Sequence, residues 1–125
     1  MNNIKKNVVK SIGPYSSIYE SKGIFMISGQ IAINEKNTKI PKDIIKQTNI
    51  ILKNIKNIIE EKNLKIKNIV KTNIFIKDIK NIKIINKIYK SFFEKYTKKL
   101  PARTCVEVSK LPKNSDIEID AIAIK

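Results

Sequence analysis

The chain has 125 residues, enough for one two-layer core, so we expect a single domain over residues 1–125. Its net charge is +15, and 28 Ile, 25 Lys and 14 Asn dominate the composition. The lysines are spread along the whole chain rather than clustered, and specific nucleic-acid recognition favours Arg, so we expect non-specific nucleic-acid binding at most.

Residues 15–33 are predicted to form a β-hairpin. Two strand-like runs flank the connection Ser21-Lys22-Gly23, and a three-residue connection with Gly last suits a type I turn followed by a left-handed residue. Gly29 lies inside the second run, which indicates a bulge or a close approach of another group to the backbone.

Two helices are predicted after the hairpin. Apolar residues recur at helical spacing over residues 43–62, where Asp43 is placed to cap the helix N-terminus. A clean apolar stripe at positions 84, 85, 88, 89, 92, 93 and 96 predicts the second helix over residues 82–96.

Three further strands are predicted, over residues 69–76, 103–109 and 116–124, with a turn at 111–114. The resulting order is strand, strand, helix, strand, helix, strand, strand. This order predicts an α+β domain with a mixed sheet and both helices on one face. The other sheet face would stay open, and its Ile-rich strands favour self-association.

The chain contains no His and one Cys, so we expect no metal centre, no disulfide within the chain and no His-based catalytic triad. Any acid–base chemistry must then use a carboxylate, Lys, Tyr or Cys. The N-terminus lacks an apolar run and no stretch of 18 apolar residues occurs. We therefore expect no signal peptide, no membrane contact and a cytoplasmic location.

Arg103 and Glu118 are the leading candidates for chemistry. Arg103 is the only arginine, and its guanidinium offers a rigid two-pronged donor for a carboxylate. The alternative is a surface or structural ion pair. Strand alternation puts Glu118 and Asp120 on one face with Ile122 and Ile124, and a carboxylate beside an apolar surface can accept a proton from water. A solvated strand end is the alternative.

Three other residues are weaker candidates by themselves. Cys105 shares a strand face with Arg103, but a lone Cys without His is more often a small core residue than a nucleophile. Tyr15 is either a site hydroxyl or a core aromatic. Asn86, in a chain rich in Asn, can equally be an ordinary surface residue.

An ordered set of stretches resembles the RidA family of enamine/imine deaminases, also called reactive-intermediate deaminases. They run along nearly the whole chain: 12–16 (IGPYS), 28–31 (SGQI), 71–78 (KTNIFIKD), 86–93 (NKIYKSFF), 101–108 (PARTCVEV), 111–112 (LP) and 117–123 (IEIDAIA). Each piece is weak alone; the last group, from residue 101 onward, is the most specific.

The resemblance implies a fold like that of the trimeric chorismate mutases and a homotrimer with sites in clefts between subunits. It implies hydrolysis of 2-iminobutanoate and 2-iminopropanoate, which pyridoxal-phosphate-dependent dehydratases release, to 2-oxo acids and ammonia without a cofactor. Arg103 would then clamp the substrate carboxylate, and Glu118 would activate water. The backbone near Cys105 would hold the substrate nitrogen or water. The remaining pocket residues would be Tyr15, Ser28, Gly29 and Asn86.

Two alternatives stay open. One is an RNA-binding or endoribonuclease-type translation inhibitor, which the high positive charge and descriptions of some family members suggest. The other is a non-catalytic, chaperone-like trimer, which a filled or blocked cleft would favour.

Overall fold

A computed structural model describes residues 10–34, 36 and 39–125. Its main elements in chain order are β1 (Ile18–Ser21), β2 (Ile24–Gln30), α1 (Ile44–Glu61), β3 (Ile69–Ile76), α2 (Ile82–Glu94), β4 (Ala102–Glu107) and β5 (Ile117–Ile124). Short 3₁₀ turns η1 (Ile66–Asn68), η2 (Ile79–Asn81) and η3 (Pro112–Asn114) lie between them. The order of strands and helices expected from the sequence is confirmed.

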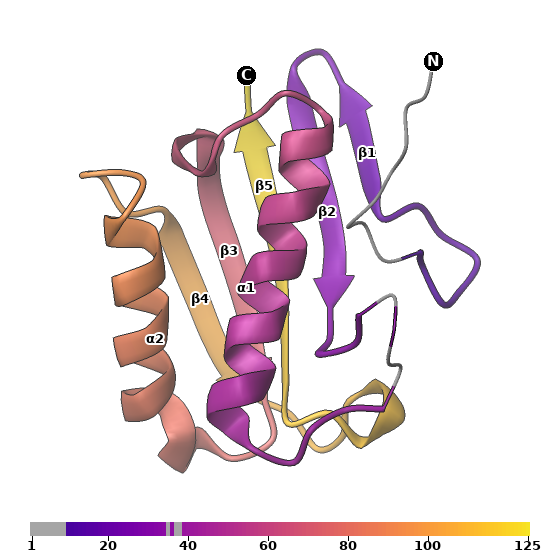
Figure 1. Cartoon of the computed structure of the whole chain (residues 1–125), viewed down its shortest axis with the longest axis vertical. Helices are drawn as coiled ribbons and strands as arrows, with labels where there is room; N and C mark the ends of the chain where they lie inside the picture. The colour runs from indigo at the N-terminus through magenta and orange to yellow at the C-terminus, as the bar shows by residue number, and fades with distance from the viewer. Residues whose placement is uncertain (1–9, 35, 37–38) are drawn as a thin grey trace.

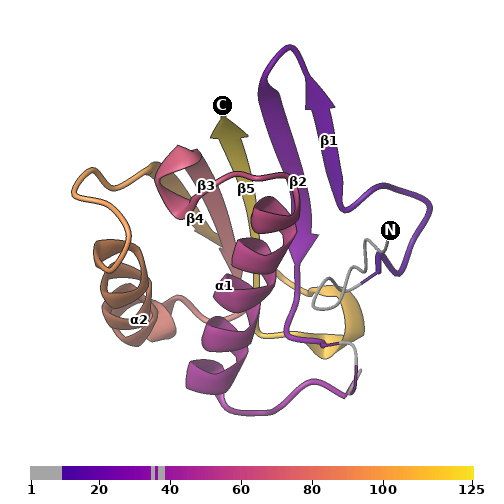
Figure 2. The ribbon, with the colours of Figure 1, turned by 45° about the horizontal axis from the view of Figure 1, so that its top comes forward.

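The five strands form one mixed sheet in the order β1-β2-β5-β3-β4. All neighbours are antiparallel except β3 and β4, which are parallel and joined through α2. Both helices lie on the same face of the sheet, as Figure 1 shows, and the β1–β2 hairpin extends away from them in Figure 2. The expected α+β arrangement with helices on one face is therefore confirmed.

The core lies between the helices and one sheet face. On β5 the odd-numbered residues from Ile117 to Ala123 are buried under the helices, while the even-numbered ones are more exposed. The facing stripe of α1 includes Ile51, Ile55 and Ile58. This burial follows from the period of two in strands and of 3.6 in helices, so the patterns in the sequence identify the core correctly.

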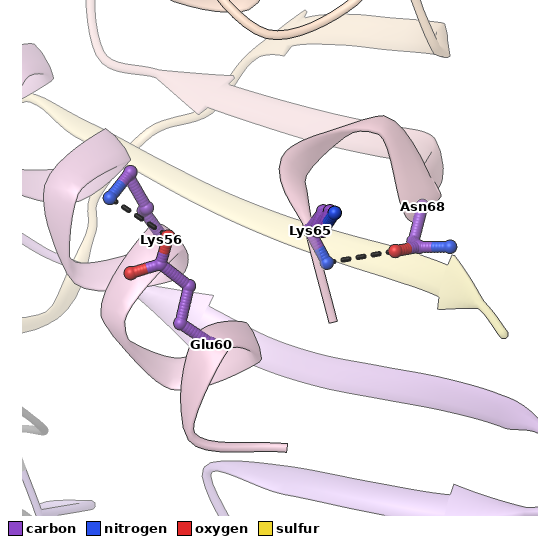
Figure 3. A network of polar contacts seen from close by, with 4 residues as sticks. All are labelled: Lys56, Glu60, Lys65 and Asn68. Atoms are coloured by element: carbon purple, nitrogen blue, oxygen red, sulfur yellow. Dashed lines mark hydrogen bonds and ion pairs between the residues drawn. The ribbon is translucent and has the colours of Figure 1, made fainter. Parts of the chain in front are cut away.

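Local hydrogen bonds fix the ends of the helices. Asp43 caps α1 as predicted, with its Oδ1 accepting from the N–H of Ile45 at 2.8 Å. Near the other end, Lys56 and Glu60 form an ion pair at 2.9 Å, and the N–H of Lys65 donates to Asn68 Oδ1 at 2.8 Å in η1 (Figure 3). The second helix ends at Glu94, two residues before the predicted end.

Buried polar side chains of α1 hold the connecting segments. Gln47 is 1% exposed; its Nε2 donates to the Pro41 carbonyl at 2.7 Å and to Asp116 Oδ2 at 2.9 Å. The N–H of Asp116 donates back to Gln47 Oε1 at 3.0 Å. These bonds tie the entry of α1 to the residue that precedes β5, and so fix where β5 begins.

The hairpin turn differs from the prediction. Ser21 pairs with Ile24, so the connection has two residues rather than three. Lys22 and Gly23 both have positive φ (52° and 79°), which is the type I′ turn rather than type I with a following left-handed residue. The twist of a type I′ turn matches that of the paired strands, and strand pairing therefore places Lys22 at a positive φ that lysine does not favour by itself.

The second sheet face carries no helix. Tyr19, Ile24, Met26, Val106 and Ile124 lie on it and are each more than 40% exposed. Exposed apolar side chains gathered on one sheet face are typical of an interaction site. We call this surface the open face. Among the described residues, no helix is long and apolar enough to cross a membrane.

Candidate active site

Arg103 lies on β4, at the edge of the sheet, and its side chain is on the helix-covered face. Its register partner on β3 is Thr72, a fully buried residue of that face. Arg103 Nη1 donates to Asn86 Oδ1 on α2 at 2.8 Å, and the guanidinium lies over the ring of Tyr89, 5.1 Å from its centroid. Within the part of the chain that the structure describes, its other N–H groups have no hydrogen-bond partner and are available to an anion.

Tyr89 supports the guanidinium from below. Tyr89 is 5% exposed, and its hydroxyl shares a 2.6 Å hydrogen bond with Thr72 Oγ1. Burial raises the pKa of the Tyr89 phenol, against the opposing effects of the Thr72 bond and the Arg103 charge. The phenol is therefore neutral at physiological pH and acts as a hydrogen-bonding group, not as an anion that would neutralise Arg103.

Cys105 follows Arg103 on the same strand face, as predicted, and packs against the core. Burial raises the pKa of its thiol, and the Arg103 charge only partly offsets this. A thiol of raised pKa is a poor nucleophile, which agrees with the expected core role of the side chain. Because β4 is an edge strand, half of its backbone N–H and C=O groups point away from β3 and remain open to a ligand or partner.

Glu118 occupies β5 on the open face and is half-buried. Burial raises the pKa of its carboxyl group, and the charge of Asp120 on the same face raises it further. Asp120 accepts a 2.9 Å hydrogen bond from Asn73 Nδ2, which holds it beside its neighbour. The expected carboxylate beside an apolar surface, with a raised pKa, is therefore present.

A pocket surrounds Glu118 on the side of β2. Its cavity volume is about 40 Å³, and Tyr15, Ser17, Gly29 and Gln30 are among the residues that line it. This volume is sufficient for a water molecule beside the carboxylate. Arg103, Cys105 and Asn86 lie on the other side of the sheet and do not line it.

Gly29 and Ser28 shape this pocket. The pairing of β2 with β5 shifts between Ile27 and Gln30, so the bulge predicted at Gly29 is confirmed. A Cβ at Gly29 would overlap the Glu118 carboxylate, so only glycine allows that side chain its place. Ser28 Oγ donates to the carbonyl of Ser16 at 2.6 Å and its N–H to the carbonyl of Ser17 at 2.9 Å, which secures the segment next to Tyr15.

The predicted site residues therefore form two groups. The arginine half comprises Arg103, Asn86 and Cys105, on α2 and the helix-covered side of β4. The glutamate half comprises Glu118, Tyr15, Ser28 and Gly29, around β2 and β5. One copy of the chain does not bring Arg103 and Glu118 together, because they leave opposite faces of the sheet on strands separated by β3.

Sequence reasoning missed Thr72 and Tyr89 as parts of the arginine half. Helical spacing identifies Tyr89 only as a member of the apolar stripe of the second helix. The hydroxyl of Tyr89 is the feature of the sequence that could have indicated this role. A buried tyrosine hydroxyl requires a polar partner, whereas Ile or Phe at the same position requires none. Among the described residues, no group of three His, Cys, Asp or Glu side chains could hold a metal ion.

Comparison with known proteins places the chain among close relatives. A family model described as Endoribonuclease L-PSP matches residues 5–125. The RutC family protein BU371 of Buchnera aphidicola (subspecies Acyrthosiphon pisum) is 48% identical, covering 96% of this chain and 94% of the relative. The 2-iminobutanoate/2-iminopropanoate deaminase of Escherichia coli K12 is 40% identical with the same coverage. The crystal structure of E. coli TdcF with bound serine has a TM-score of 0.90 at 35% identity, covering 94% of this chain and 93% of that chain.

Proposed function

The chain belongs to the Endoribonuclease L-PSP family, to which its RidA-like motifs also assign it, and we propose that it hydrolyses 2-imino acids such as 2-iminobutanoate and 2-iminopropanoate. The observation that carries the proposal is the pair of half-sites: a held guanidinium with free donors, and a half-buried carboxylate in a pocket. The names of the relatives agree with this activity, as does a bound amino acid in TdcF.

The reaction needs only these two groups and a water molecule. The Arg103 guanidinium binds the substrate carboxylate through two parallel hydrogen bonds. Glu118 takes a proton from water as the new C–O bond forms at the imine carbon and the C=N electron pair moves to nitrogen. Glu118 then returns that proton to the nitrogen, which gives a carbinolamine. The carbinolamine hydroxyl next passes its proton through Glu118 to the nitrogen as the C=O bond forms and the C–N bond breaks, so that ammonia leaves and the 2-oxo acid remains. One imine and one water yield one oxo acid and one ammonia.

The raised pKa of Glu118 suits both its acceptance and its return of a proton. A carboxyl group of raised pKa is a stronger base than an ordinary glutamate once ionised, and a general base contributes about 10²–10⁴-fold to a rate. The arginine contributes by binding the substrate carboxylate, which keeps its charge throughout the reaction. Because the substrate carboxylate is bonded directly to the imine carbon, both protein groups must reach atoms only a few ångströms apart.

A second copy of the chain would bring the two halves together. Within one chain they are separated by two strand spacings, about 10 Å, and point away from opposite sheet faces. The exposed apolar open face, which bears Glu118, supplies a reason to associate, and β4 supplies an unpaired edge beside Arg103. We propose that copies assemble as the homotrimer that the family resemblance implies, with one site at each contact.

The activity is tested by adding the protein to a threonine dehydratase reaction and following release of 2-oxobutanoate. We expect acceleration over buffer in the wild type. We expect a loss of about 10²–10⁴-fold in Glu118→Gln, the contribution of a general base. Arg103→Lys keeps the charge but loses the two-pronged donor, and kcat/KM should fall about 10- to 100-fold. A wild type that does no better than buffer would refute the proposal.

The two alternative functions, an RNA-directed activity and a non-catalytic, chaperone-like trimer, also remain open to test. RNA binding that persists above about 150 mM salt and is unchanged in Glu118→Gln would favour an RNA-directed function, whereas steep loss with salt indicates counterion release alone. The pocket beside Glu118 is open rather than filled, which is the feature expected of a catalytic member. The cytoplasmic location also remains a prediction from the sequence.

A further inference from the structure

We infer that Tyr89 and Thr72 are positioning residues for the carboxylate-binding guanidinium of Arg103. The inference rests on the proposed function, because it assigns the means by which the arginine half of that site is held in place. It adds two buried side chains that never reach the substrate to the residues that determine how well the substrate binds.

The supporting contacts form one continuous chain from the core to the guanidinium. Thr72 is 1% exposed on β3, the register partner of Arg103, and bonds the Tyr89 hydroxyl at 2.6 Å. The Tyr89 ring lies under the guanidinium at 5.1 Å and packs against Phe93, with ring centroids 4.6 Å apart. Asn86, one helical turn before Tyr89, accepts from Nη1.

This arrangement restrains the guanidinium in two directions. Asn86 fixes the guanidinium within its plane by taking one N–H, and the Tyr89 ring fixes the height and tilt of that plane. The ring in turn is held at its far end by Thr72, so its tilt is set by β3 as well as by α2. A phenylalanine at position 89 would keep the aromatic ring under the guanidinium but lose the hydrogen bond to Thr72.

The expected consequence is specific to substrate binding. The substrate carboxylate keeps its charge and its bonds throughout the reaction, so its contact with Arg103 is the same in the ground state and the transition state. Loosening such a contact raises KM and leaves kcat nearly unchanged. A purely structural role for the Thr72–Tyr89 bond would lower stability without this selective change.

Three variants test the inference against a matched control. Tyr89→Phe and Thr72→Val each remove the hydroxyl bond while keeping the shape, and Tyr89→Leu removes the platform as well. Ile58→Val, in the core on α1 and away from β4, is the control for lost stability. We expect KM to rise roughly fivefold in the first two variants, the factor for one hydrogen bond. A larger rise is expected in Tyr89→Leu, and none in Ile58→Val.

A second measurement does not depend on activity. Arg103 is the only arginine, so its Nε–Hε group gives a single side-chain signal in a ¹H–¹⁵N NMR spectrum. We expect this group to be ordered in the wild type, and its order parameter to fall toward about 0.6 in Tyr89→Phe and Thr72→Val. The signal should also shift on addition of 2-oxobutanoate, a stable carboxylate probe.

These two measurements separate the possible failures. If the wild type hydrolyses no imine but the Nε order falls in Tyr89→Phe and Thr72→Val, the proposed function fails and the positioning role stands. Unchanged KM and unchanged Nε order in both variants would overturn the positioning role even in an active enzyme. An equal rise of KM in Ile58→Val would also overturn it, because general destabilisation would then explain the effect.

Discussion

Mixing two impaired variants tests whether the proposed active site is shared between chains. Arg103→Lys damages only the arginine half, and Glu118→Gln damages only the glutamate half. Because the structure separates these halves onto opposite sheet faces, each variant retains one intact half. A chain of the first kind beside a chain of the second can therefore form one complete site.

The recovered activity can be calculated from this arrangement. In a closed ring, each site takes its arginine half from one chain and its glutamate half from the neighbour. After equal mixing, the arginine half of a given site is intact with probability one half, and the glutamate half is intact with the same probability. About a quarter of the sites should therefore be complete. If one chain supplied both halves, no site in the mixture would be complete.

The assay is release of 2-oxobutanoate from a dehydratase reaction after the two variants are unfolded together in urea and refolded. Each variant and the wild type, refolded separately, set the zero and full values. Different affinity tags on the two chains allow mixed oligomers to be isolated and shown to exist. Mixed oligomers with no more activity than the separate variants would refute the shared site.

Four further results are expected. Glu118 accepts a proton only when ionised, so kcat/KM should fall as pH decreases through its raised pKa. Asp120→Asn removes one cause of the raised pKa and should move this fall in kcat/KM to lower pH; an unchanged pH profile would contradict the role of Asp120. The raised pKa also means that the stability contributed by Glu118 is present below its unfolded pKa and is lost as pH rises through the folded one, so Glu118→Gln should increase the free energy of unfolding at neutral pH in urea titrations. Gly29→Ala puts a methyl group where the Glu118 carboxylate lies and should reduce kcat/KM at least about tenfold, like other displacements of a reacting group; activity near wild type would show that the carboxylate can move. Gln47→Leu breaks three hydrogen bonds, two of them with Asp116, and should lower the free energy of unfolding by about 2–4 kcal/mol, measured as a smaller urea midpoint.

Features that depend on near neighbours in the chain could be predicted from the sequence. The alternation over Ile117–Ile124 placed Glu118 on the face opposite Ile117 and Ile119, because successive strand side chains point to opposite sides whatever the strand pairs with. The Asp43 cap and the buried stripe of α1 were equally local. Glycine at position 29 indicated the bulge before any pairing was known.

Features that depend on register between distant segments were decided only by the tertiary structure. The sequence named Arg103 and Glu118 but could not show that β3 separates their strands or that they leave opposite faces, since strand order depends on how the sheet packs against the helices. The same applies to Tyr89: helical periodicity made it a core residue, and only the pairing of β3 with β4 placed Thr72 and Arg103 around its ring. The sequence therefore provided the candidate groups, whereas the fold determined that a single chain holds them apart.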